Sequence, residues 1–161
     1  MQRRHKALAF ANSIHFVTIV TEMRGSWFVT PDQCRSMLEL LEGYRARLDL
    51  RCLGYVLMPD HLHVLLWQES DDVLIPKLVE GFKSVSARTL KLHGYPAARL
   101  WTRHYDDVPV PGSDAANTKL VYMHNNPVRQ GLVETPDQYL WSSARVLMGY
   151  ESKSIVTLSF L

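Results

Sequence analysis

Two histidines, His61 and His63, are the first residues of this chain whose types and spacing suggest chemistry. They follow a Pro59-Asp60 turn signal in the segment GYVLMPDHLHVLLW (residues 54–67), whose pattern predicts two β-strands. Because side chains alternate along a strand, both imidazoles are expected on one face, where they can converge on one divalent metal ion. Asp60 is placed to orient one of them. In the simpler interpretation, one histidine bonds to the backbone and the other faces solvent.

A metal site needs further ligands, and the best candidates lie in the segment KLVYMHNNPVRQG, at the end of an expected helix. Tyr122 and Asn126 are four positions apart and therefore share one helix face. The amide oxygen of Asn126 is expected to complete a ligand set with His61 and His63, beside the hydroxyl of Tyr122. His124 is expected to point elsewhere. Without the histidines, Tyr122 is better explained as a packed or surface aromatic residue and NNP as an ordinary helix end.

The elements that must position these residues follow the order β-α-β-β-α-β-α. Strands are expected at residues 13–21, twice within 54–67, and at 105–110, and helices at 30–48, 73–93 and 113–127. Thr30, Pro31 and Gln33 predict a capping box at the start of the first helix, and Ser113 is the expected N-cap of the third. This order predicts an α+β fold of the ferredoxin-like kind, an antiparallel sheet with helices packed on one face. The other face is then free to bind a ligand.

The composition predicts a single globular domain. The chain has 161 residues, 47% of them hydrophobic, and a formal net charge of +2. We expect one unit over residues 1–161, with a core at about 13–144 and a C-terminal tail at 145–161. The two cysteines match no disulfide framework, and no apolar run approaches the ~20 residues of a membrane span. We therefore expect a cytoplasmic protein with no membrane contact.

Four segments, YVLMPDHLHVLLW, LWTRHYDD, YMHNNPVRQGLV and YLWSSA, occur in an order that resembles the single-tyrosine HUH transposases of the smallest bacterial insertion sequences. The resemblance is greatest to the REP-associated tyrosine transposases and spans roughly residues 13–144. It implies one HUH transposase domain in which His61 and His63 bind the metal, Tyr122 is the nucleophile and Asn126 helps to hold the metal. The segment WTRHYDDVPV departs from the family pattern at Thr102 and at Pro109-Val110.

The resemblance implies an enzyme that nicks and rejoins single-stranded, hairpin-containing DNA through a 5′-phosphotyrosine intermediate, and that is nucleoid-associated when bound to DNA. The mixed nitrogen and oxygen ligands suit Mg²⁺ or Mn²⁺, although zinc stays possible. Two alternatives remain open: a domesticated hairpin-DNA-binding protein with little or no cleavage, and an unrelated metal hydrolase that activates water. A homodimer and a monomer are both compatible with the sequence. Tyr122 therefore forms the site either with the histidines of its own chain or with those of a neighbouring chain. No residue stands out as a general base for Tyr122.

Basic residues are concentrated between residues 77 and 103, where six cations accompany one acidic residue. On the expected helix at 73–93, the small residues Gly81 and Ser84 lie between cations, which would let a phosphate backbone approach. The candidate DNA contacts are Lys77, Lys83, Ser84, Arg88, Lys91 and Arg103. A solvated helix face is an equally good interpretation for any one of these residues.

Overall fold

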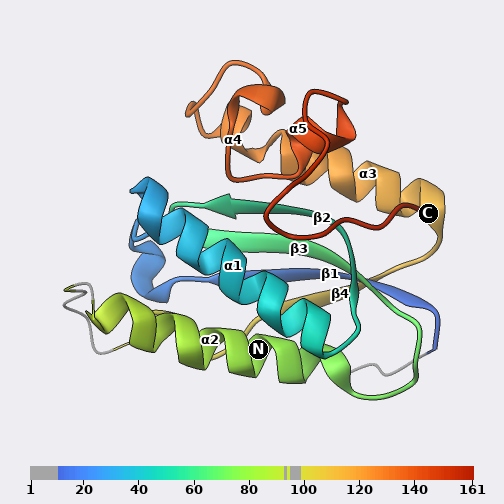
Figure 1. The fold of residues 1–161 in the computed structure, drawn as a ribbon, viewed down its shortest axis with the longest axis horizontal. Coiled ribbons are helices and arrows are strands. Elements are labelled where there is room, and N and C mark those ends of the chain that lie inside the picture. The colour runs from blue at the N-terminus through green and yellow to red at the C-terminus, as the bar shows by residue number, and fades with distance from the viewer. Residues whose placement is uncertain (1–10, 93, 95–98) are drawn as a thin grey trace.

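A central antiparallel sheet of four strands organises the computed structural model, which describes residues 11–92, 94 and 99–161 (Figure 1). The main elements are β1 (Ser13–Val20), α1 (Pro31–Arg47), β2 (Arg51–Met58), β3 (His61–Gln68), α2 (Leu74–Leu92), β4 (Asp106–Val110) and α3 (Ser113–His124). Short helices α4 (Asn126–Arg129) and α5 (Ala144–Leu147) follow, and 3₁₀ turns occupy Glu22–Arg24 and Pro136–Gln138. The predicted order β-α-β-β-α-β-α is confirmed. His93, the expected end of the second helix, lies outside the described residues.

The strand order is β2-β3-β1-β4, which is the order of a ferredoxin-like sheet. All three pairings are antiparallel, and the register places Val20 opposite His61 and Thr18 opposite His63. The α+β class and the antiparallel sheet are therefore confirmed. Pro109 lies in β4, an edge strand of the sheet. Proline has no N–H group, and an edge strand tolerates this loss because it is not hydrogen-bonded on both sides.

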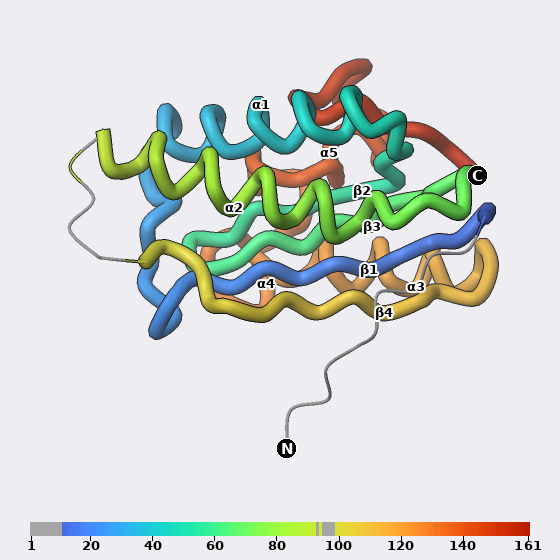
Figure 2. The backbone as a smooth tube through the Cα atoms, turned by 90° about the horizontal axis from the view of Figure 1, so that it is seen from below, coloured from blue at the N-terminus to red at the C-terminus, as the bar shows by residue number. Residues whose placement is uncertain are grey.

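Helices cover both faces of the sheet, whereas we expected them on one face only. Helices α1 and α2 pack on one face, and α3 and α4 lie on the other (Figure 2). The aliphatic side of β3, with Leu62 and Val64, belongs to the core under α1 and α2, as predicted. A second core lies on the opposite face, where Met123 of α3 packs in one cluster with Phe16 and Leu65. The face that carries the histidines is therefore occupied by the helix that carries Tyr122.

Helix α3 approaches the sheet closely at Gly54 of β2. A Cβ atom at this position would overlap Cδ2 of Leu120 and would lie 3.2 Å from Oγ of Ser143. Only glycine leaves this space open, so the glycine of β2 determines how near α3 lies to the sheet.

The helix ends match the sequence at α1 and differ from it at α3. Thr30 and Gln33 form the predicted capping box, with Gln33 N–H donating to the Thr30 hydroxyl and Gln33 Oε1 accepting from Thr30 N–H. The prediction that Ser113 is the N-cap of α3 is wrong, because Ser113 is already helical. The N-cap is Gly112 with φ of 90°, a left-handed conformation that glycine adopts without strain.

The C-terminal segment packs along the outer edge of β2. Ser159 N–H donates to the Cys52 carbonyl at 2.7 Å, and Val156 is fully buried in the core. Both cysteines, Cys34 and Cys52, are buried free thiols. Within the described residues, no helix has the length and apolarity needed to cross a membrane.

Candidate active site

The two histidines of β3 lie side by side beneath α3 and α4. Their side chains point to the same face of the sheet, as alternation requires, and their ring centroids are 4.6 Å apart. Only 6% of His61 and 7% of His63 is exposed. The predicted convergence of the two imidazoles is therefore present, although the face around them is covered rather than open.

His61 is held at both ring nitrogens. Its Nδ1 lies 2.6 Å from Oδ1 of Asp60, and its Nε2 lies 2.8 Å from Nδ2 of Asn126. Burial lowers the pKa of His61, and the neighbouring Asp60 only partly opposes this effect. With Nδ1–H donating to the carboxylate, the lone pair of Nε2 faces the Asn126 amide. Asp60 thus occupies the orienting position that the sequence predicted.

His63 is fixed by β1, the strand beside it. Its Nδ1 lies 2.7 Å from the Thr18 hydroxyl, and its ring stacks on Phe16 at a centroid distance of 5.0 Å. Burial first, and then the nearby positive groups, lower its pKa to about 3. At neutral pH the imidazole is therefore uncharged, which is the form that binds a metal ion.

Tyr122 lies above His63, near the end of α3. The centroid of its ring is 6.1 Å from that of His63 and 6.3 Å from that of Phe16. The side chain is 48% exposed, so its hydroxyl-bearing ring is open to a large substrate. His124, on the same helix, points away as predicted and lies 2.8 Å from the Ser143 hydroxyl.

Asn126 reaches His61 because the backbone stays helical past the end of α3. Asn125 has helical dihedral angles, and Asn126 begins α4 with Pro127 in the first turn, where its missing N–H costs nothing. Asn126 is buried, and its carbonyl accepts from Gln130 N–H. The predicted helix end near Pro127 is thus a junction between two helices, and Asn126 lies one turn beyond Tyr122 as expected.

Two cations lie beside Tyr122 that were not predicted from the sequence as site residues. The guanidinium carbon of Arg129 lies 4.4 Å from the centroid of the Tyr122 ring, and Nζ of Lys119 lies 5.9 Å from it. Lys119 precedes Tyr122 by three positions and Arg129 follows it by seven. Residues at both spacings share one face with Tyr122 if the helix is continuous. Because the sequence predicts a helix end near Pro127, it does not place Arg129 on this face.

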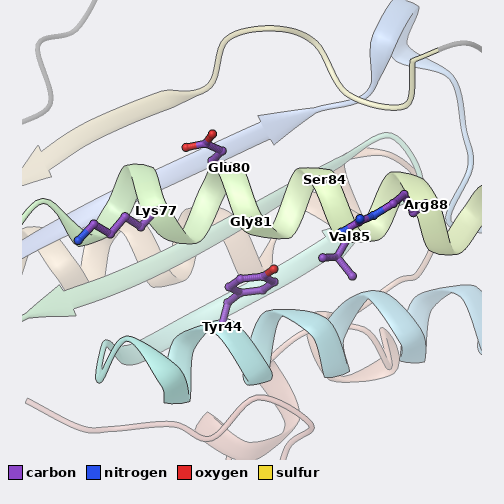
Figure 3. Close-up of a pocket in the computed structure, with 7 residues that line it drawn as sticks. All are labelled: Tyr44, Lys77, Glu80, Gly81, Ser84, Val85 and Arg88. Carbon is purple, nitrogen blue, oxygen red and sulfur yellow. The ribbon is translucent and has the colours of Figure 1, made fainter.

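Helix α2, which carries predicted DNA contacts, lies on the other face of the sheet from α3, the helix that carries Tyr122 (Figure 2). A pocket of about 380 Å³ between α1 and α2 is lined by Tyr44, Lys77, Glu80, Gly81, Ser84, Val85 and Arg88 (Figure 3). Gly81 is explained by helix packing, because a Cβ atom there would overlap the ring of Tyr44. The structure does not bring Lys77, Ser84, Arg88 and Lys91 together with the histidines.

Lys83 has an internal role. Its ammonium group donates to the carbonyls of Thr102, Arg103 and His104 and lies over the ring of Tyr105. Burial lowers its pKa. The ammonium group of Lys83 therefore joins α2 to the segment before β4, whereas Arg103 is an exposed residue of that segment.

The described residues contain no group of three His, Cys, Asp or Glu side chains that could hold a metal ion. A metal at His61 and His63 would therefore require a ligand of another type. The structure places the side-chain amide of Asn126 beside one of these imidazoles, that of His61.

Comparison with known proteins identifies the family. The family model described as transposase, IS200 like, matches residues 9–126, whereas no curated protein matches. A solved structure of a REP-associated tyrosine transposase bound to a REP hairpin covers 99% of this chain and 93% of its own, with 14% identity and a TM-score of 0.77. A crystal structure of a candidate transposase from Deinococcus radiodurans matches over 78% of this chain and 96% of its own, with 20% identity and a TM-score of 0.53. These structures show that the fold is shared, and the family match, over most of the chain, shows that the protein belongs to the IS200-like transposases.

Proposed function

We propose that this transposase nicks and rejoins hairpin-containing single-stranded DNA, with Tyr122 as the nucleophile and a divalent metal ion as cofactor. The observation that carries the proposal is the position of the Tyr122 ring, 6.1 Å from His63, above a pair of neutral histidines. A half-exposed tyrosine beside buried imidazoles is unexpected for packing alone. It is the arrangement needed when a phosphate must reach both a hydroxyl nucleophile and a metal ion.

The donor set fits Mg²⁺ or Mn²⁺. The Nδ1 atoms of His61 and His63 contact Asp60 and Thr18, so the Nε2 atoms are the ones that would bind a metal ion. The amide of Asn126 already lies beside Nε2 of His61, and half a turn of that amide would present its oxygen instead of its nitrogen. We propose that His61, His63 and Asn126 hold the ion. When bound, the ion would neutralise charge on the oxygens of the scissile phosphate.

Tyr122 performs the bond exchange in the proposed mechanism. Its phenolic oxygen attacks the phosphorus atom and forms a bond to it, while the bond from phosphorus to the 3′ oxygen breaks. The phenolic proton leaves to solvent, which the exposure of Tyr122 permits, and the 3′ oxygen takes up a proton as it departs. The products are a 5′-phosphotyrosine and a free 3′-hydroxyl. Because one phosphoester replaces another, the reaction is reversible, and attack by a different 3′-hydroxyl rejoins the DNA.

Hairpin DNA is the proposed substrate. A protein of the same fold binds a REP hairpin, and the family comprises transposases. The strand to be cut would lie at Tyr122. The candidate contacts Lys77, Ser84, Arg88, Lys91 and Arg103 would meet other parts of the DNA, because the sheet separates α2 from the histidines.

Formation of a covalent adduct tests the proposal. The protein is incubated with Mn²⁺ and a DNA hairpin that carries single-stranded flanks, and the products are separated in SDS. We expect an SDS-stable adduct that is absent with Y122F and absent in EDTA. Tight hairpin binding by the unaltered protein without any adduct would reject cleavage and favour a DNA-binding protein without it.

A further inference from the structure

Arg129 and Lys119 place two positive charges near the ring of Tyr122. Arg129, the last residue of α4, donates from Nη2 to the Tyr122 carbonyl at 2.9 Å and lies over its ring. Lys119, one turn before Tyr122 on α3, has Nζ 4.9 Å from the ring centroid of Phe16. The half-exposed tyrosine therefore has a guanidinium group and an ammonium group beside its ring.

Carboxylates do not compensate these two charges. Arg24, Arg45, Arg51 and Arg145 each form an ion pair with an acidic side chain. Among the residues that the structure describes, no such ion pair is formed by Arg129 or Lys119. Their contacts are aromatic faces and one carbonyl oxygen, which leave most of the N–H donors of Arg129 available. An anion that approached Tyr122 would meet both groups.

We propose that Arg129 and Lys119 form an anion subsite for the phosphate group that Tyr122 attacks. The inference rests on the proposed function and assigns to it two residues that contact the substrate. Phosphoryl transfer spreads negative charge over the non-bridging oxygens, and fixed cations beside the nucleophile stabilise that charge. The guanidinium group also presents paired donors that match two phosphate oxygens, which an ammonium group lacks. Arg129 would thus select the orientation of the phosphate, and Lys119 would contribute charge.

Binding without cleavage gives the first test. In the Y122F background, with EDTA present, the affinity for the flanked hairpin is measured by fluorescence anisotropy at several salt concentrations. Removing one cation that binds a phosphate of single-stranded DNA makes the slope of log K against log salt shallower by about 0.7. We expect this decrease for R129Q and for K119Q. The control K153Q removes one charge from an exposed residue of the C-terminal segment and is expected to leave the slope unchanged.

Adduct formation gives the second test, with Tyr122 intact. R129Q and K119Q are expected to slow the adduct by about 10²-fold, the usual cost of removing one donor to a developing oxyanion. R129K is expected to recover part of the rate, because it keeps the charge but not the forked donors. Unchanged salt slopes in both Gln variants would overturn the subsite, even if R129Q slowed the adduct, because Arg129 would then only position Tyr122. Failure of the unaltered protein to form any adduct would reject the proposed function while the binding slopes still test the subsite.

Discussion

Asn126 and His61 are 65 positions apart in the sequence, yet Nδ2 of one lies 2.8 Å from Nε2 of the other. The contact joins the start of α4 to the start of β3 and links the helical layer directly to the histidine pair. It places a side-chain amide at the one nitrogen of His61 that Asp60 leaves unoccupied. The metal proposal therefore depends on this contact.

Replacing Asn126 tests the third ligand. We expect N126A to weaken Mn²⁺ binding by about tenfold or more, measured by calorimetry, because only the two imidazoles remain. N126D keeps an oxygen donor and is expected to retain binding. The matched control is N125A, because the Asn125 amide bonds to the Val121 carbonyl within the helix. Equal affinities of N126A and N125A would remove Asn126 from the ligand set.

Asp60 is expected to support the metal without touching it. Its carboxylate fixes the Nδ1–H of His61, and removal of such an orienting partner typically costs about 10–100-fold in metal affinity. We therefore expect D60A to bind Mn²⁺ more weakly by that factor. R24A is the control, because it removes the long, exposed contact between Arg24 and the same carboxylate and leaves the histidine contact intact. A comparable loss of Mn²⁺ affinity in R24A would show that the effect comes from the turn as a whole.

Local rules predicted most of the fold. The capping box at Thr30 and the alternation through His61 and Leu62 depend on neighbouring residues, so the sequence reveals them directly. The placement of α3 on the second face depends instead on Gly54, whose missing side chain admits Leu120 from 66 positions away. No local pattern shows which partner a strand glycine will meet.

The charged residues were harder to assign for a related reason. Lys83 looks like a surface cation in the sequence, yet three carbonyls of a distant segment bind its ammonium group. Arg129 was missed for the opposite reason. The NNP segment predicts a helix end, so nothing in the sequence indicated that Arg129 lies beside Tyr122. The proximity of Asn126 to the histidines could be predicted because strand alternation and helix spacing are short-range.

The close approach at Gly54 predicts a measurable decrease in stability. In G54A the added methyl must displace Leu120 and crowd the Ser143 hydroxyl, and such overpacking typically costs about 1–3 kcal/mol in the free energy of unfolding. G43A is a matched control, because nothing lies within 4 Å of the new methyl and Gly43 is inside α1. We expect G43A to gain up to about 1 kcal/mol in urea unfolding. Equal stability of the two variants would show that α3 shifts without cost.

Glu42 predicts the acid dependence of stability. Burial alone raises its pKa, but hydrogen bonds from Arg45 and Thr157 outweigh this effect and leave the pKa below its ordinary value. The folded state therefore favours the carboxylate, and its contribution is present above the unfolded pKa and disappears as the pH falls through the folded pKa. We expect the wild type to lose about 1 kcal/mol more than E42Q between pH 7 and pH 3 in urea unfolding. Parallel decreases in the two proteins would exclude Glu42 as the cause.

The position of Tyr122 over the histidines of its own chain predicts that one chain completes the site. Helix α3 packs on β2 and β3 of the same molecule, with Met123 fully buried in that contact. We mix H63A, which keeps the tyrosine, with Y122F, which keeps both histidines, and assay the SDS-stable adduct on hairpin DNA. We expect none, because neither chain has a complete site and an exchange of α3 would require Met123 to leave its core. An adduct on the H63A chain would show instead that the tyrosine helix is exchanged between two protomers.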